Sequence, residues 1–112
     1  MRLKHQKESQ LSKTLFRGVH YAPQFSYVIP LINEENSLEE LVSSISSVVN
    51  EINLNYEIIL IDDGSKDKSW EIISKLCALD HNIKGIRFLK NFGKSQALSA
   101  GFKASKGEVI IT

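Results

Sequence analysis

Short apolar runs alternate with longer amphipathic segments from residue 25 to the end of the chain. The apolar runs are rich in β-branched and aromatic residues, and they predict strands at 25–32, 56–61, 83–89 and 108–112. Apolar residues at helical spacing predict helices at about 38–52, 70–79 and 94–104. Strands that alternate with helices of this length form right-handed crossovers. The predicted fold class is therefore α/β, a βαβαβαβ parallel sheet with helices on both faces.

Composition narrows the class of protein further. With 42% hydrophobic and 24% charged residues, the 112-residue chain has the make-up of one globular domain rather than of a disordered segment. Its single cysteine, Cys77, excludes an internal disulfide and a cysteine-based zinc cluster. No apolar run reaches the ~18 residues of a membrane-spanning helix. The net charge of +1 gives no reason to expect a nucleic-acid partner.

The charge is concentrated in the first 24 residues, which carry five basic side chains against one acidic one. We expect residues 1–24 to form a basic, mobile leader, because chain termini are commonly poorly ordered. The alternative is a basic arm that touches an anionic membrane surface. The segment lacks the apolar block of a secretory signal.

Polar side chains follow each of the first three predicted strands. Asn33-Glu34-Glu35 follow the first, Asp62-Asp63 the second, and Asn91 and Lys94 the third. Ligands of open parallel sheets bind outside the carboxyl ends of the strands, where these residues converge. We therefore place the candidate site at this edge.

Each acidic residue at the edge has a structural and a functional interpretation. One of the two aspartates, Asp63, is expected to accept backbone N–H groups and cap the second helix. Asp62 then faces the cleft and accepts a hydrogen bond or binds a metal. Glu34 either favours a helix N-terminus through the dipole or contacts a ligand. Lys94 is unfavourable to the helix dipole at its position beside Gly93, and this placement favours an anionic partner such as phosphate.

Several nucleotide-binding motifs are absent from the sequence. There is no GxxxxGK[ST] loop and no GxGxxG after the first strand. A phospho-receiver domain would need an acceptor aspartate at the end of a later strand, and none is found.

Three segments carry a family resemblance: VIPLINEEN (28–36), YEIILIDDGSKDKSWEII (56–73) and IRFLKNFGKSQALSAGFKASKGEVIIT (86–112). In this order they resemble the N-terminal part of family 2 glycosyltransferases, which have the GT-A fold. They look most like the bacterial branch similar to dolichyl-phosphate mannosyltransferase. Members of that branch move a sugar from a nucleotide-sugar to a polyprenyl phosphate at the cytoplasmic face of a membrane.

The resemblance implies that the nucleotide-sugar site comprises Pro30, Leu31, Ile32, Glu34, Asp62, Asp63, Asn91, Gly93 and Lys94. By this resemblance residues 30–32 line the base, Glu34 lies close to base and ribose, and Asp62 accepts a hydrogen bond from the base. The family usually has an aromatic residue where this chain has Ile32, so aliphatic contact replaces stacking on the base.

The resemblance also assigns structural and phosphate-binding roles. It implies that Asp63 and Ser65 order their loop and cap the helix, and that Asn91, Gly93 and Lys94 form a wall near the diphosphate. A divalent cation, Mg or Mn, is expected on the diphosphate in the full-length family, held by an Asp-x-Asp motif. This chain contains no Asp-x-Asp and ends at Thr112, where the motif is expected.

The resemblance also implies which part of an enzyme this chain represents. We expect residues 25–112 to be a truncated GT-A domain that holds the donor-binding half, has no catalytic residue and is inactive alone. The full-length protein would use a UDP- or GDP-linked sugar and a polyprenyl phosphate acceptor in surface glycan synthesis, in the cytoplasm or at the cytoplasmic face of the membrane. The open edge of the last strand predicts self-association. The alternatives are a non-catalytic nucleotide-binding module and a gene remnant.

Overall fold

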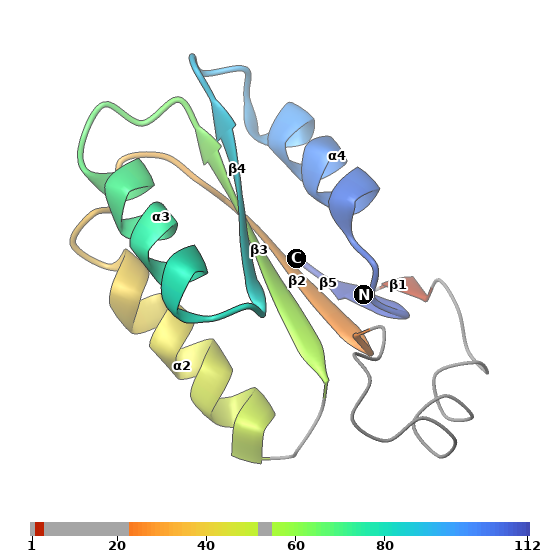
Figure 1. Cartoon of the computed structure of the whole chain (residues 1–112). Coiled ribbons are helices and arrows are strands. Elements are labelled where there is room, and N and C mark those ends of the chain that lie inside the picture. Colours follow the sequence, from red (N-terminus) through yellow and green to blue (C-terminus); the bar gives the residue numbers. More distant parts are fainter. Residues whose placement is uncertain (1, 4–22, 52–54) are drawn as a thin grey trace.

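The computed structural model describes residues 2–3, 23–51 and 55–112 (Figure 1). Most of the predicted leader lies outside these residues. The elements, in chain order, are β1 (Arg2–Leu3), β2 (Phe25–Leu31), α2 (Leu38–Glu51), β3 (Tyr56–Asp63), α3 (Ser69–Leu79), β4 (Ile83–Phe88), α4 (Lys94–Ala104) and β5 (Val109–Ile111).

The sheet has the strand order β1-β5-β2-β3-β4. Strands β5, β2, β3 and β4 run parallel to one another, which confirms the predicted α/β class and the βαβαβαβ order. Strand β3 is two residues longer than predicted and includes Asp62 and Asp63, which pair with Arg87 and Phe88 of β4. The two aspartates are thus held by the sheet ladder rather than by a free loop.

One end of the sheet differs from the prediction. Arg2–Leu3 pair antiparallel with Ile110 and Val109, so a short segment of the leader lies along β5. The expectation that the outer edge of β5 is bare is therefore wrong over these residues. Hydrogen-bonding groups that a bare edge would present to another chain are used by β1 instead.

The helices cover both faces of the sheet. In Figure 1, α2 and α3 lie on one side of the strands and α4 on the other. Strand β3 is buried along its whole length, as expected of a central parallel strand. Its alternate residues pack into two cores, one on each face of the sheet. Ile58 and Leu60 pack into the core under α2 and α3, whereas Ile59 and Ile61 pack into the core under α4.

Helix α4 approaches the sheet closely because Gly101 lies at the contact. A Cβ at this position would meet the Val28 side chain and would lie 2.8 Å from Cδ1 of Ile61. The close approach seats α4 on β2 and β3. Its first residue, Lys94, follows the loop that leaves the carboxyl end of β4.

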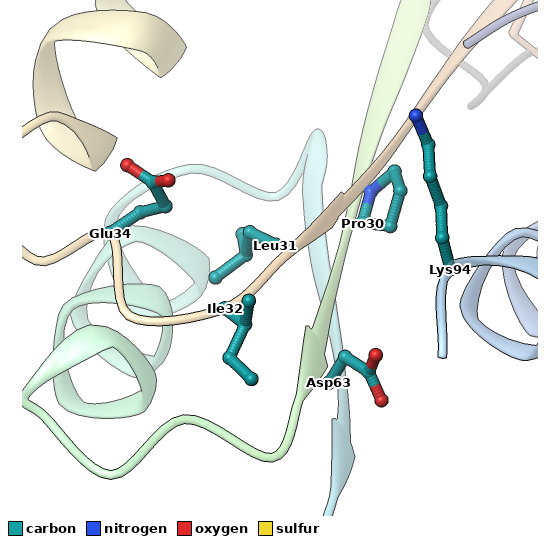
Figure 2. Close-up of a pocket in the computed structure, with 6 residues that line it drawn as sticks. All are labelled: Pro30, Leu31, Ile32, Glu34, Asp63 and Lys94. Carbon is teal, nitrogen blue, oxygen red and sulfur yellow. The ribbon is translucent and has the colours of Figure 1, made fainter. Parts of the chain in front are cut away.

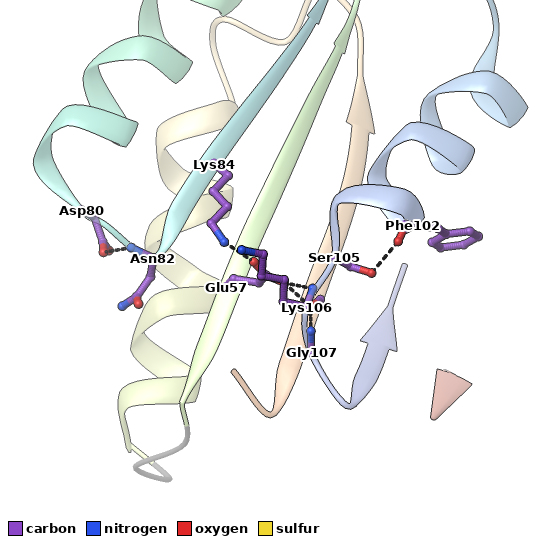
Figure 3. Close-up of polar contacts among 9 residues, drawn as sticks. Glu57, Asp80, Asn82, Lys84, Phe102, Ser105, Lys106 and Gly107 are labelled. Atoms are coloured by element: carbon purple, nitrogen blue, oxygen red, sulfur yellow. Dashed lines mark hydrogen bonds and ion pairs between the residues drawn. The ribbon is translucent and has the colours of Figure 1, made fainter. Parts of the chain in front are cut away.

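A buried polar network lies near the amino-terminal ends of β2, β3 and β4 (Figure 3). The carboxylate of Glu57, which is 2% exposed, accepts hydrogen bonds from Lys84 Nζ at 2.6 Å and from Ser26 Oγ at 2.5 Å. The Lys106 N–H donates to the same carboxylate at 2.6 Å, and the Gly107 N–H donates to Ser26 Oγ at 2.8 Å. The network therefore ties β2, β3 and β4 to the α4–β5 loop.

Candidate functional site

The loops after β2 and β3 are joined by reciprocal hydrogen bonds. The Asn33 N–H donates to Ser65 Oγ at 2.8 Å, and the Lys66 N–H donates to Asn33 Oδ1 at 2.9 Å. Asn33 has a φ of 53°, a left-handed conformation that asparagine tolerates better than most residues. The Glu34 N–H is held in turn by Ser69 Oγ at 2.9 Å. This bracing fixes the path of the chain directly after β2.

Asp67 binds the start of α3 and the same loop. Its Oδ1 accepts the Ser69 N–H at 2.8 Å and its Oδ2 accepts the Glu35 N–H at 3.1 Å. Desolvation raises the pKa of Asp67, but hydrogen bonds from Ser69 and Glu35 outweigh it and hold the pKa below its ordinary value. The carboxylate is therefore stabilised in the ionised form that accepts both N–H groups.

Asp63 joins β3 to the loop before α4. Its Oδ1 accepts the Phe92 N–H at 2.8 Å and its Oδ2 accepts the Gly93 N–H at 3.0 Å. The prediction that Asp63 caps the second helix is therefore wrong. Since β3 continues through Asp63, its side chain reaches the neighbouring β4–α4 loop, and Asp67 instead accepts the N–H of Ser69, the first residue of α3.

Asp62 lies deeper than Asp63. It is fully buried, and its Oδ1 accepts the Ser65 N–H at 2.9 Å. Its Oδ2 is buried without a hydrogen-bond partner in the described part of the chain. Since burying an unpaired carboxylate oxygen is costly, a donor that reached this atom would be favoured.

A cavity of about 240 Å³ opens at the carboxyl edge (Figure 2). Its lining is Pro30, Leu31, Ile32, Glu34, Asp63 and Lys94. The structure therefore brings six of the nine predicted site residues to one cavity. Asn91 lines a neighbouring hollow, Gly93 precedes α4 and donates to Asp63, and Asp62 is buried outside both linings.

The cavity combines an apolar floor with charged walls. Pro30, Leu31 and Ile32 supply the apolar surface, and Ile32 is 37% exposed. In Figure 2 the Lys94 side chain extends away from the Asp63 carboxylate. Among residues 23–51 and 55–112, the ion pair of the structure joins Lys84 and Glu57, near the amino-terminal ends of the strands. Lys94 and Asp63 form no ion pair within these residues. The Glu34 carboxylate accepts the Ser37 hydroxyl at 2.8 Å.

The described residues do not form a metal centre. No group of three or more His, Cys, Asp or Glu side chains is placed to hold a cation in the parts of the chain that the structure describes. Both oxygens of Asp63 accept backbone N–H groups, which leaves this carboxylate poorly suited to act as a ligand. The residues present therefore do not fit the divalent cation.

Sequence reasoning missed the bracing residues Asn33 and Ser69 and the buried Glu57. An asparagine directly after a strand is a signal for a left-handed turn, so Asn33 could have been found. Glu57 carries a weaker signal, namely a charged residue inside the apolar run 56–61 that is predicted to form a strand.

A parallel α/β sheet with a cavity at the carboxyl ends of its strands defines an open α/β domain, whose ligands bind at those ends. The family model described as Glycosyl transferase family 2 matches residues 26–112. The chain belongs to this family.

Curated relatives agree with the family model. One is an undecaprenyl-phosphate 4-deoxy-4-formamido-L-arabinose transferase from Aeromonas hydrophila, 42% identical over 88 residues that cover 78% of this chain and 27% of the relative. Another is an uncharacterized glycosyltransferase, YkcC, from Bacillus subtilis, 36% identical over 79% of this chain and 27% of the relative. The chain thus spans about a quarter of the length of these relatives.

A solved structure supports the fold. The crystal structure of TarS from S. aureus superposes with a TM-score of 0.65 at 24% sequence identity, over 80% of this chain and 16% of TarS. The superposition supports the α/β fold, and together with the family match it agrees with the GT-A type predicted from the sequence. No helix among the residues that the structure describes is long and apolar enough to cross a membrane.

Proposed function

We propose that the chain is the donor-binding half of a glycosyltransferase that moves a sugar from a nucleotide-sugar, UDP- or GDP-linked, to polyprenyl phosphate. The acceptor is proposed from relatives whose names specify undecaprenyl phosphate. We further propose that the whole protein acts at the cytoplasmic face of a membrane in surface glycan synthesis. The Mg or Mn ion expected for the full-length family would require an Asp-x-Asp motif, which the 112-residue sequence does not contain.

The observation that carries the proposal is the cavity of Figure 2. Its apolar floor, Pro30 to Ile32, offers a surface for the flat face of a base. Ile32 provides aliphatic contact where an aromatic residue would stack. The Glu34 carboxylate, on the other wall, can accept hydrogen bonds from ribose hydroxyls.

The phosphate end is proposed at the start of α4. Lys94 supplies a positive charge at a helix N-terminus, which itself favours anions. Asp63 holds the Phe92 and Gly93 N–H groups and so orients the loop that precedes Lys94. Asp63 is thus proposed to act as a positioning residue, and Asp62 to accept a hydrogen bond from the base through its unpaired oxygen.

Nucleotide binding by the intact 112-residue chain tests this proposal. We expect UDP or GDP to raise the thermal unfolding midpoint, because a ligand that binds only the folded state stabilises it by about 2.7 kcal/mol at a hundred times its Kd. Lys94→Ala should weaken binding of the diphosphate about tenfold, as expected for the loss of one charge-assisted contact, and should leave binding of the nucleoside unchanged.

The matched control is Lys103→Ala, which removes a lysine from the last turn of the same helix. We expect its diphosphate affinity to equal that of the parent chain. Absence of any shift with millimolar UDP and GDP would refute the donor site, and an equal loss in both variants would refute the role of Lys94.

A further inference from the structure

The loop between β4 and α4 exposes two large apolar side chains. Leu89 is 88% exposed and Phe92 is 54% exposed, and they flank Lys90. In Figure 1 this loop lies at the extremity of the molecule, beyond the carboxyl end of β4. Scattered exposed apolar residues are common, but two in one projecting loop form a local apolar surface.

The structure holds Phe92 in its outward position. Its ring packs edge-on against Phe88, with ring centroids 5.6 Å apart and an interplanar angle of 89°. Its backbone N–H is bound by Asp63, and Lys90 Nζ lies 5.1 Å from its ring centroid. The apolar group and the adjacent cation are therefore presented together.

Two lysines adjoin this apolar surface. A hollow of about 480 Å³ is lined by Lys66 and Lys90 together with Leu89. Lys94 follows two residues after Phe92 in the chain. Acidic groups at this edge are engaged within the chain. Asp63 is 6% exposed and accepts two backbone N–H groups. The Asp67 carboxylate, next to Lys66, accepts the Ser69 and Glu35 N–H groups, and the Glu34 carboxylate accepts the Ser37 hydroxyl.

We propose that the projecting loop, residues 89–92 with Lys66, docks on an anionic lipid bilayer. Leu89 and Phe92 would enter the headgroup boundary, where apolar and aromatic side chains are favoured. Lys66 and Lys90 would lie at the level of the anionic headgroups, which attract basic residues near the surface. The combination of two exposed apolar side chains with the adjoining Lys66 and Lys90 favours a charged lipid surface over a purely apolar partner. The inference rests on the proposed membrane location of the whole protein and adds the surface that would contact the lipid. Vesicle binding needs no nucleotide, so its outcome is separate from that of the nucleotide-binding test.

Vesicle binding by the full 112-residue chain tests the inference. Co-sedimentation would be measured with phosphatidylcholine vesicles and with vesicles that also contain phosphatidylglycerol. We expect binding to the anionic vesicles only. Leu89→Ser with Phe92→Ser should lower the partition coefficient about tenfold, and Lys90→Gln should lower it about fivefold. Because every variant keeps residues 1–24, any contribution from this basic segment is common to all.

The control is Leu79→Ser, which removes a leucine that is 85% exposed at the carboxyl end of α3. It should leave the partition coefficient unchanged. Leu89→Ser alone is the second variant, for the case in which the double variant does not fold. Its side chain is almost fully exposed, so its replacement should leave the fold intact. Equal binding to both kinds of vesicle would overturn the inference, as would an unchanged partition coefficient in folded Leu89→Ser and in the double variant. Loss of self-association rather than of vesicle binding would overturn it in favour of a contact between copies of the chain.

Discussion

Asp62 and Asp63 are adjacent in sequence but perform different tasks at the carboxyl end of β3. Successive side chains of a strand point to opposite faces, so the two carboxylates reach different neighbours. Asp62 is directed to the turn of its own chain at Ser65, whereas Asp63 is directed to Phe92 and Gly93. This division makes Asp63 the residue that connects the cavity wall to the projecting loop.

Asp63→Asn should destabilise the chain, because one carboxylate oxygen that accepts an N–H is replaced by an amide that donates. We expect a loss of about 1–3 kcal/mol in the free energy of unfolding, the cost of leaving a buried donor unsatisfied. Urea denaturation followed by circular dichroism measures this loss.

Asp80→Asn is the control for that substitution. Asp80 accepts a single backbone N–H, that of Asn82, through Oδ1 at 2.9 Å, and an asparagine can retain this bond. Its free energy of unfolding should change by less than about 0.5 kcal/mol. Similar losses in the two variants would argue against a special role for the paired acceptors of Asp63.

The sequence predicted which residues gather at the site better than it predicted their contacts. Convergence of Glu34, Asp63 and Lys94 follows from the general rule for parallel sheets, and the structure shows it. The division of labour between Asp62 and Asp63 depends on how far β3 extends. Strand ends are set by pairing with β4 rather than by local preference, so the contact of Asp62 with Ser65 and the contacts of Asp63 with Phe92 and Gly93 required the structure.

At the scale of elements, helical periodicity located α4 at its observed bounds, 94–104, because Gly93 precedes it and its apolar face is regular. Strand β3 was located less fully, since aspartates are unfavourable in strands. Apolar content alone did not show how the elements are joined to one another. At the end of the sheet opposite the cavity, the hydrogen bonds of Glu57 join them.

The Glu57 network predicts a pH-dependent stability. Burial raises the pKa of Glu57, but hydrogen bonds from Lys84, Ser26 and the Lys106 N–H outweigh it. The pKa is therefore held below its ordinary value of 4.5. A carboxyl with a lowered folded-state pKa stabilises the fold above its unfolded-state pKa, and this stabilisation is lost as pH falls through the folded-state value.

Glu57→Gln should remove this dependence. The variant should be about 1–3 kcal/mol less stable than the parent at pH 7, because the ionised acceptor of three donors is lost. The difference should shrink as the pH is lowered below about 4.5. Urea unfolding at a series of pH values from 7 to 3 measures both effects, and Glu71→Gln, on the exposed side of α3, is the control. A constant difference over the whole range would show that ionisation of Glu57 does not stabilise the fold.

At the scale of the whole molecule, the polar features are divided between the two edges of the sheet. The carboxyl edge holds the cavity, Lys94 and the projecting loop, whereas the opposite edge holds the Glu57 network. The interior β3 connects them, since it carries Glu57 near its start and Asp63 at its end. The hydrogen bonds that stabilise the sheet therefore lie at one end of the strands, and the groups available to a ligand or a membrane lie at the other.

The two edge strands of the sheet are β1 and β4, and the cover of β5 by β1 predicts the state of association. Arg2–Leu3 occupy backbone groups of β5 that would otherwise be free to pair with another chain. Deletion of residues 1–3 should therefore increase self-association, measured as the weight-average mass by light scattering over a range of concentrations. Arg2→Gln is the control, because it removes the charge and keeps the backbone that pairs. We expect it to match the parent chain. If the deletion leaves the mass unchanged while Arg2→Gln raises it, charge repulsion rather than strand pairing protects this edge.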